Sequence, residues 1–402
     1  MRLLVSFLLA GLLITDGEAQ NWHSPHPWRA DAVVDGRARD YNNEYFLHAF
    51  SYRHLLDHPS PLEEGIRGTA GSLTSDRLYM DFRYHQSFAF DNPDQAFTLD
   101  IQRAEDFDGS YDRQLVGFRQ AVAQRWQLSL QGDVFSDKSL TDIYFGARRL
   151  HGEGSWLQLS LVLPNAYFND KTDSQSELID EPRTLFVQWH QQHSAGASTS
   201  LSVNHSPDAT LNDRTRGDQV SSRQTRVALS HRTQIGDWQW QADIHSERTR
   251  RQHQLDEAVN PQAFRRDMAS LTLAMRYLPH RWQPQMGARY FWLDEDGWFG
   301  RELNGSGEVR RQEPMLFGGI SLSLSDTQRL APTVYLSRPR VEQTVNSQQW
   351  RDRDDNDFVG KLSVPWHITV SKQNGAILSI VPSMRLHRFA FGGGNVQLHW
   401  PL

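Results

Sequence analysis

Three adjacent polar residues, Asn204, His205 and Ser206, offer the most direct route to catalysis in this sequence. A serine nucleophile needs a base such as histidine within hydrogen-bond reach. The surrounding residues alternate as in a β-strand, and adjacent residues of a strand point to opposite faces. His205 and Ser206 are therefore expected to lie apart unless a bulge intervenes, and a polar strand end is the better interpretation.

Histidine and acidic residues also recur at spacings that suggest metal binding. His190 and His193 are three residues apart, which on a strand places them on opposite faces, and no further ligands lie near them in the sequence. The acidic segments 294–297 and 351–357 carry carboxylates of the kind that bind calcium. Alternatively they are solvated loops whose neighbouring arginines bind lipid phosphates, and the sequence leaves this open. No metal or other cofactor is predicted.

The elements that must position these residues follow from a period of two. Apolar residues recur at every second position in about 17 segments after residue 77, which is typical of strands with two different faces. No convincing amphipathic helix interrupts them. From about residue 150, tight turns alternate with long polar stretches that we interpret as loops. The turns are 151–155, 233–237, 279–281, 325–328 and 371–375, and the predicted loops are 165–182, 206–223, 246–264, 294–313 and 339–357.

Composition indicates an exported protein that faces an apolar environment. Hydrophobic residues are only 38% of the 402, yet there are 13 Trp, 11 Tyr and 20 Phe, which a disordered chain would lack. Residues 1–19 have the layout of a secretory signal peptide, so the mature chain is expected to begin at Gln20. The chain has no cysteine, which excludes disulfides, and its net charge of -6 argues against a nucleic-acid partner.

These patterns predict an all-β fold, a transmembrane up-and-down antiparallel β-barrel of about 16 to 18 strands. In hydrocarbon every backbone N–H and C=O must be paired within the protein, so a spanning sheet must close. We assign the barrel to residues 61–402 and expect 20–60 to be a periplasmic segment or a plug. A barrel whose two ends lie in the periplasm needs an even number of strands, so a further strand is expected near 45–52 or 66–73.

The last eight residues, NVQLHWPL, alternate apolar and polar side chains to the end of the sequence. With this strand, the chain resembles a Gram-negative outer-membrane β-barrel protein of the porin-like class. The resemblance implies that the barrel assembly machinery of the outer membrane recognises Val396, Leu398, Trp400 and Leu402. The family usually ends in an aromatic residue, so Leu402 and the preceding Pro401 depart from its pattern. The implied location is the cell outer membrane, with lipid and lipopolysaccharide as neighbours.

A secreted β-sandwich or β-helix would also show alternation. Aromatic residues at strand ends favour the membrane barrel, because such barrels carry aromatic girdles at both interfaces. These are Trp126, Trp156, Trp189, Trp238, Tyr277, Trp282 and Trp292. Four prolines inside predicted strands are unexpected, since central strands normally exclude proline. They are Pro284, Pro332, Pro365 and Pro382.

If the apolar positions face lipid, the positions between them face the lumen. The predicted pore-lining residues are Arg83, Arg119, Arg148, Arg226, Arg232, Arg276, Arg289 and Arg385. With Arg281, Arg329 and Lys361 the inward set has 11 basic residues, against 5 acidic ones, Asp81, Asp100, Asp133, Asp142 and Asp243. A basic lining concentrates anions and holds carboxylate or phosphate groups. Alternatively, these charges pair across strands and rigidify the interior.

Three functions are compatible with this organisation. The first is a channel for passive passage of small anionic or saccharide solutes, or for export of an acidic polymer. The second is a non-conducting barrel that scaffolds a periplasmic or surface partner. The third, a hydrolase using Ser206, is the least favoured, and we predict that the protein is not an enzyme. The sequence names neither the solute nor the oligomeric state.

Overall fold

The computed structural model describes residues 64–402 apart from short gaps. The gaps are residues 73–77, 93, 107–108, 124, 134–142, 153, 164–175, 181–182, 195, 214–217, 256–261, 280, 299–305, 346–347 and 351–356. Within the described residues, no helix is long and apolar enough to cross a membrane. The predicted signal peptide and the segment 20–60 lie outside these residues, so both stay predictions.

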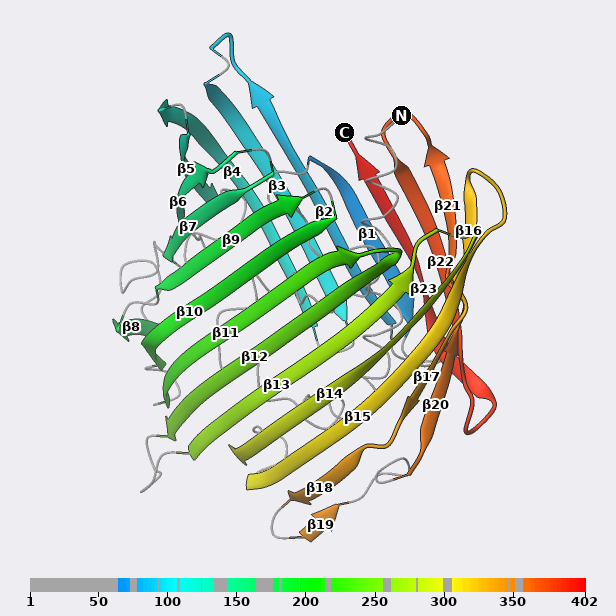
Figure 1. The fold of residues 1–402 in the computed structure, drawn as a ribbon. Helices are drawn as coiled ribbons and strands as arrows, with labels where there is room; N and C mark the ends of the chain where they lie inside the picture. The colour runs from blue at the N-terminus through cyan, green and yellow to red at the C-terminus, as the bar shows by residue number, and fades with distance from the viewer. Residues whose placement is uncertain are drawn as a thin grey trace.

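The described chain forms β-strands joined by turns (Figure 1). The first strands are β1 (Gly65–Ser72), β2 (Leu78–Ala89), β3 (Gln95–Asp106), β4 (Gly109–Ala123), β5 (Trp126–Asp133), β6 (Ile143–Leu150), β7 (Trp156–Leu163), β8 (Ser176–Asp180) and β9 (Thr184–Ser194). The long middle strands are β10 (Ala197–Asp213), β11 (Asp218–Ile235), β12 (Trp238–Leu255), β13 (Gln262–Tyr277), β14 (Trp282–Trp298) and β15 (Ser306–Ser323). The last are β16 (Gln328–Leu330), β17 (Thr333–Ser337), β18 (Arg340–Val345), β19 (Gln348–Trp350), β20 (Val359–Ser363), β21 (Trp366–Ser371), β22 (Ala376–Arg385) and β23 (Ala390–Pro401).

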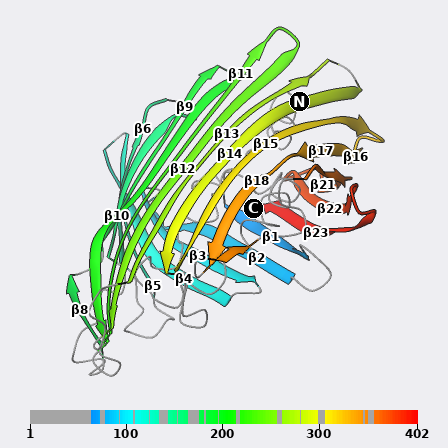
Figure 2. The same cartoon turned by 90° about the horizontal axis from the view of Figure 1, so that it is seen from below.

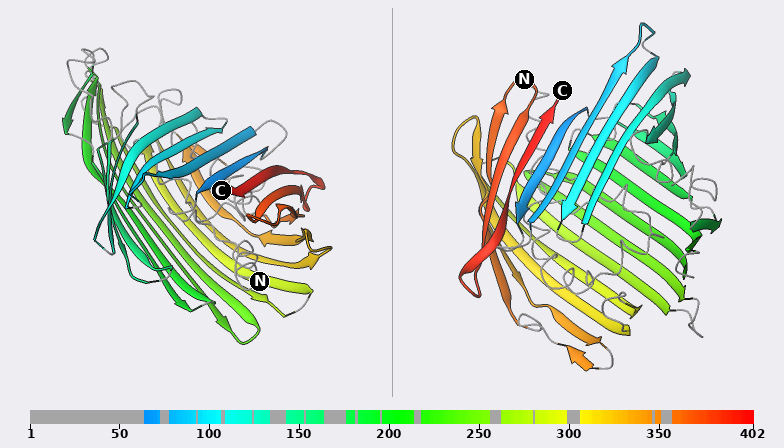
Figure 3. Two further views of the ribbon diagram at one scale, coloured as in Figure 1. Left: turned by 90° about the horizontal axis from the view of Figure 1, so that it is seen from above. Right: turned by 180° about the vertical axis from the view of Figure 1, so that it is seen from behind.

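All of these strands belong to one antiparallel sheet, which closes where β23 pairs with β1. Three strands of the wall are divided into consecutive pieces, β8 with β9, β16 with β17 and β18, and β19 with β20 and β21. The result is a closed barrel of 18 strands, which confirms the predicted fold class. Figure 1 and the right panel of Figure 3 show β23 in red beside β1 in blue, and Figure 2 shows the sheet curling around an interior.

The further strand that an even strand number requires is β1, which corresponds to the predicted candidate 66–73. The other candidate, 45–52, lies outside the described residues. β1 pairs along its whole length with β23, from Gly65 opposite Pro401 to Ser72 opposite Gly394. The even strand number follows from this pairing, because an antiparallel sheet closes on itself only when the first and last strands run in opposite directions.

The final strand has the two faces that its sequence predicts. Val396, Trp400 and Leu402 are exposed on the outer wall, while Asn395 and Gln397 are buried on the inner side. The Leu402 N–H donates a hydrogen bond to the carbonyl oxygen of Glu64 at 3.1 Å, so pairing continues to the last residue. That Val396, Leu398, Trp400 and Leu402 form an assembly signal stays a prediction.

The two ends of the barrel differ. At one end of the barrel, which we call the turn end, eight hairpin turns of two to five residues connect the strands, and the start of β1 and the end of β23 lie at the same end. These eight include all five turns that the sequence predicts. One of them is the two-residue turn at Gly236 and Asp237, where the φ of Gly236 is +60°, a left-handed conformation that glycine adopts without steric cost. We call the opposite end, where the longer connections lie, the loop end.

The outer wall is apolar over the middle of the barrel. Leu273, Leu316 and Leu336 expose 52%, 64% and 51% of their surfaces on it. Other exposed members are Phe97, Phe118, Leu128, Leu130, Phe145, Leu159, Leu161, Leu185, Trp240, Ile244, Leu271, Met286, Val334 and Ile380. A continuous apolar wall of this kind does not face water in a soluble protein, whereas it matches the hydrocarbon of a bilayer. The predicted lipid-facing side of the strands is therefore correct.

Most of the predicted girdle aromatics lie on the outer wall, with one correction. Trp126 and Trp282 are exposed at the turn end, and Trp238 contacts Tyr277 with ring centroids 5.2 Å apart. Trp156, in contrast, is only 9% exposed, because it begins β7 one position out of phase with the outward leucines of that strand. It faces the interior and does not belong to the girdle.

The prolines lie mostly where the hydrogen-bond ladder is interrupted. Pro332 separates β16 from β17, Pro365 separates β20 from β21, and Pro382 lies at a shift of register between β22 and β23. Because proline has no N–H to donate, it is tolerated at such breaks. Pro284 lies within β14 opposite Ile320, and nothing in the structure explains it.

Four of the predicted loops are wrong, and the described residues of the segment 339–357 are mainly β18 and β19. The segments 206–223, 246–264 and 294–313 are largely strand, because β10 to β15 continue for 16 to 18 residues each. Crossing the hydrocarbon takes only about 9 to 11 residues of a tilted strand. The remainder extends past the apolar wall at the loop end, where the backbone ladder persists although the side chains become polar.

An arginine in the middle of the outer wall should destabilise the barrel more than one at its edge. Leu273→Arg should lower the free energy of unfolding by about 2 to 4 kcal/mol, since the cost of a lipid-facing charge depends on depth. Ile235→Arg, at the turn end of β11, should cost only about 0 to 1 kcal/mol. Denaturant unfolding in phospholipid vesicles, followed by tryptophan fluorescence, measures both. Equal losses would mean that the wall does not lie in hydrocarbon.

Candidate functional site on the inner wall

The inner wall is built by the second set of alternating positions. Of the eight predicted pore-lining arginines, seven lie on the inward positions of their strands: Arg119, Arg148, Arg226, Arg232, Arg276, Arg289 and Arg385. The side chain of Arg83 lies outside the described residues. Lys361 and Arg329 are also inward, whereas Arg281 is exposed in the turn between β13 and β14. That these residues line an open pore stays a prediction.

Inward ion pairs occupy the loop half of the interior. Arg226 Nε lies 2.9 Å from Glu247 Oε2, and Arg266 Nε lies 2.6 Å from Glu295 Oε2. Glu247 and Glu295 are almost fully buried. Burial raises the pKa of Glu295, which lies beyond the level of Trp292, although the charge and hydrogen bond of Arg266 oppose the rise. These pairs join neighbouring strands from the inside.

A third pair lies within β15. Arg311 Nε and Nη2 both donate to Glu313 Oε2, at 2.9 and 2.6 Å, and the Ser337 hydroxyl donates to Glu313 Oε1. None of the three pairs was predicted, because most of their residues fall in 246–264 and 294–313, which were interpreted as loops. These pairs could have been recognised if charged residues of opposite sign at every second position had been counted as a continuation of the strands. The inward acids are therefore more numerous than predicted.

The turn half of the interior holds a different arrangement, which we call the turn-end arginine cluster and define as Arg232, Arg276 and Arg329. The charges of Arg232 and Arg329 lie close enough to repel that of Arg276. Arg276 has no exposed surface, and its Nη2 donates to Gln285 Oε1 at 3.1 Å. Its Nε and Nη1, and the Nε of Arg329, are buried without a hydrogen-bond partner among the described residues. The negative charge of Asp243 interacts with the charge of Arg232.

Arg148 forms a second inward group with aromatic neighbours. Its Nε and Nη2 donate to Gln158 Oε1 at 3.0 and 2.6 Å, and its guanidinium lies 5.8 Å from the ring centroid of Trp156. Trp156 in turn stacks against His190 at 6.2 Å. The charge of Arg119 lies close by. Planar groups of this kind bind carboxylates and sugar rings, which suits the solute classes predicted from the sequence.

The structure does not bring the candidate catalytic residues together. Ser206 is buried on the inner side, where its hydroxyl is hydrogen-bonded to Thr184 Oγ1 at 2.8 Å. His205 faces outward, with Nδ1 hydrogen-bonded to Thr225 Oγ1 at 2.9 Å. Because the sheet wall separates the imidazole from the hydroxyl, His205 cannot act as the base for Ser206.

The candidate metal ligands are likewise separated. His190 lies on the inner wall, whereas His193 lies on the outer wall and is hydrogen-bonded to Thr199 Oγ1 at 2.8 Å. The segment 294–297 is part of β14 and not a loop, and Asp294 is paired with Arg265. The segment 351–357 lies almost wholly outside the described residues. Among those that are described, no group of three or more histidine or acidic side chains is arranged to hold a metal ion.

Together, the closed sheet, the apolar outer wall and the charged inner wall define a transmembrane β-barrel of the outer-membrane type. No protein-family model matches the chain, and no curated protein matches it. Solved structures with similarity to it include OccK11 of Pseudomonas aeruginosa, with 12% identity and a TM-score of 0.41 over 85% of this chain and 98% of that one. Another is OccK2 of the same organism in complex with glucuronate, with 11% identity and a TM-score of 0.41 over 84% and 96% of the two chains.

A third similar structure is OmpT of Vibrio cholerae, with 11% identity and a TM-score of 0.35 over 84% of this chain and 96% of that chain. At these identities and TM-scores, the similarities assign no function to this protein. Its function must be inferred from the placement of its own residues.

Breaking one inward ion pair should cost more than removing both partners. Glu247→Leu leaves the Arg226 charge buried without its partner and should lower the free energy of unfolding by about 3 to 5 kcal/mol. Combining it with Arg226→Met should recover most of that loss, since a well-packed apolar pair is often neutral. Urea unfolding in detergent or vesicles measures all three variants.

The control for this cycle is Arg223→Met. Arg223 and Asp208 form an exposed pair, 3.6 Å apart, on the neighbouring stretch of wall. An exposed pair contributes only about 0 to 1 kcal/mol. If Glu247→Leu cost no more than this control, the Arg226–Glu247 pair would not stabilise the interior.

Proposed function

We propose that this protein is a channel of the cell outer membrane that passes small anionic or saccharide solutes, or exports an acidic polymer, by passive diffusion. Export by the predicted signal peptide and insertion by the barrel assembly machinery belong to the same proposal. The apolar outer wall supports a membrane location, and the direction of the charge imbalance inside supports anions as the solute.

The turn-end arginine cluster is the observation that carries this proposal. Three guanidinium groups from β11, β13 and β16 share one region of the inner wall, and among the described residues Asp243 opposes the charge of Arg232 there. Buried donors without partners attract groups that accept hydrogen bonds and carry negative charge. A carboxylate or phosphate entering the barrel meets a favourable field at this level.

Barrel size is compatible with this function. An 18-stranded barrel is wide enough to enclose an aqueous channel, whereas an eight-stranded one is filled by its own side chains. The inward ion pairs at the loop half add no net charge to the interior. Solutes would thus be selected by charge at the turn half, where the cationic residues predominate.

A second candidate function is a non-conducting scaffold. It is favoured by the complete burial of several inward charged side chains, including Arg276, Arg311 and Glu295, which are between 0% and 1% exposed. Water does not reach these side chains in this conformation. A barrel closed at their level would anchor a periplasmic or surface partner and pass nothing.

Conductance in planar bilayers distinguishes the two functions. We expect a steady open current with anions more permeant than cations, measured as the reversal potential across a salt gradient. Replacing Arg232, Arg276 and Arg329 together by glutamine should lower the anion-to-cation permeability ratio several-fold, because the field at the turn half is removed.

The matched control is Arg149→Gln, which removes one positive charge on the outer wall beside Trp126. It should leave the permeability ratio unchanged. The absence of current from folded protein at every voltage and salt concentration would exclude the channel and leave the scaffold. A current without anion preference would keep the pore but refute the role of the cluster.

A further inference from the structure

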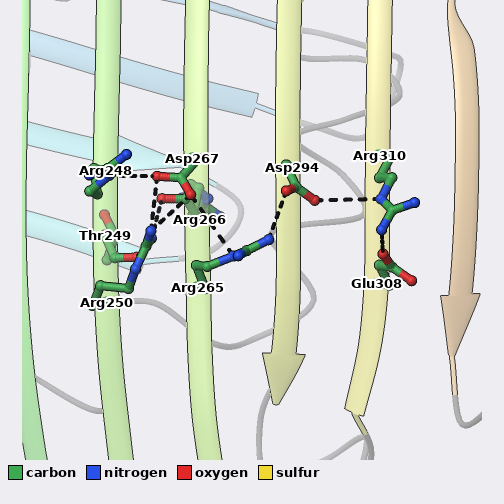
Figure 4. A network of polar contacts seen from close by, with 9 residues as sticks. All are labelled: Arg248, Thr249, Arg250, Arg265, Arg266, Asp267, Asp294, Glu308 and Arg310. Carbon is green, nitrogen blue, oxygen red and sulfur yellow. Dashed lines mark hydrogen bonds and ion pairs between the residues drawn. The ribbon is translucent and has the colours of Figure 1, made fainter.

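A group of charged residues lies on the outer wall at the loop end of four neighbouring strands, β12 to β15 (Figure 4). We call it the outer-wall arginine cluster and define it as four arginines with three acids. The arginines are Arg248, Arg250, Arg265 and Arg310, and the acids are Asp267, Asp294 and Glu308. No step of the proposed channel function uses these residues.

The strand register places the group on the lipid side. Arg248, Asp267, Asp294 and Arg310 are direct cross-strand neighbours in one row. Each of them is offset by an even number of positions along its strand from an outward apolar residue, so they project from the same face. These residues are Ile244, Leu271, Tyr290 and Leu316.

The depth of the row is set by Trp292. That residue occupies the preceding outward position of β14, and Tyr290 occupies the one before it. Two residues of a strand tilted by about 35 to 45° correspond to about 5 Å of depth, so Asp294 in this row lies about 5 Å past Trp292, away from the hydrocarbon. Interfacial aromatics mark the boundary of the hydrocarbon. The outer-wall arginine cluster therefore lies at the level of the lipid headgroups.

Within the group, two of the acids, Asp267 and Asp294, lie beneath the arginines, whereas Glu308 is 41% exposed beside Arg310. The side chains of Asp267 and Asp294 are 15% and 21% exposed, whereas those of Arg248, Arg265 and Arg310 are 69%, 46% and 60% exposed. Arg248 Nε lies 2.9 Å from Asp267 Oδ1, and Arg265 Nη2 lies 2.8 Å from Asp294 Oδ2. The carboxylates thus hold the guanidinium groups in place from below and leave their outer edges to the surroundings.

The acids are charged in this arrangement. Partial burial raises the pKa of Asp267. The hydrogen bonds and charges of Arg250 and Arg248 lower the pKa by more than this, so that it lies below its ordinary value. The ion pairs therefore persist at neutral pH. Asp296, exposed on the same face opposite Arg265 and Glu308, is a fourth acid, so the group carries no net positive charge. The exposed layer over Asp267 and Asp294 is formed by Arg248, Arg265 and Arg310.

We propose that the outer-wall arginine cluster binds the phosphate groups of an anionic lipid in the leaflet around the loop end, with lipid A of the outer membrane as the ligand. Guanidinium groups bind phosphate through two parallel hydrogen bonds, and arginines near the membrane surface attract anionic lipid heads. The acyl chains would lie along the apolar wall formed by Leu271, Leu273 and Leu316. The choice of lipid A, and not the binding of phosphate, rests on the proposed outer-membrane location.

The test is a titration of purified folded barrel in detergent with bisphosphorylated lipid A, with bound lipid counted by native mass spectrometry. The variant is Arg248→Gln, Arg265→Gln and Arg310→Gln together. Each basic residue near a lipid surface contributes about 1 kcal/mol, which is about fivefold in affinity, so the loss should be on the order of a hundredfold. Heat-dependent migration on gels verifies that the variant is folded.

The matched control removes three exposed arginines at the turn end, Arg125→Gln, Arg149→Gln and Arg281→Gln, and should bind lipid A as the unaltered protein does. Dephosphorylated lipid A should bind weakly and equally to all three proteins. If the cluster variant bound bisphosphorylated lipid A as tightly as the control, the ion pairs would serve only the barrel itself and the proposal would fail. Inorganic phosphate binding as tightly as lipid A would assign the cluster to a free anion and overturn the lipid assignment.

This experiment and the conductance measurement fail independently. Lipid binding on the outer wall does not require an open lumen, and the cluster variant should keep the current and selectivity of the unaltered channel. A protein without conductance that still binds lipid A through this cluster would refute the channel alone.

Discussion

In hydrocarbon, each backbone N–H and C=O must find its partner within the protein, and the architecture of this chain depends on that constraint. Closure is its direct consequence, because β1 and β23 would otherwise expose two edges. Even the interruptions of the wall are paired. The Ala331 N–H donates to the Pro365 carbonyl at 2.8 Å, and the Ile320 N–H donates to the Pro332 carbonyl at 3.0 Å. Pro332 and Pro365 thus occur at breaks of the wall where the proline carbonyl accepts a bond and the missing donor is tolerated.

The sequence predicts the parts of the strands that cross the hydrocarbon, but not the polar parts that extend beyond it into water. Alternation of apolar residues located nearly every spanning segment and gave the correct facing of seven arginines. It failed where β10 to β15 leave the bilayer, since backbone pairing persists there without apolar side chains to mark it. Trp156 was assigned to the wrong face because it was placed by its position at a strand end, although the alternation of Leu157, Leu159 and Leu161 puts it on the inner side.

The same failure explains why the interior was predicted to be more basic than it is. Glu247, Glu295 and Glu313 neutralise arginines in the loop half, and all three fall in segments interpreted as loops. Paired charges at that level stiffen the wall, because a buried guanidinium held by a carboxylate has little freedom to move. The cationic excess is left in the turn half, around Arg276. Charge selection is thereby separated along the barrel axis from structural reinforcement.

The preference for arginine over lysine, with only four lysines among 42 basic residues, has a physical meaning at both walls. Arg276 lies within the inner wall without a carboxylate partner in the described residues, and Arg248 lies on the outer wall over Asp267. A guanidinium keeps its charge when buried and offers a planar fork to an anion, whereas a lysine in the position of Arg276 would tend to lose its proton. One residue type can therefore serve an aqueous solute inside and a lipid headgroup outside, and the neighbouring residues decide which anion each arginine meets.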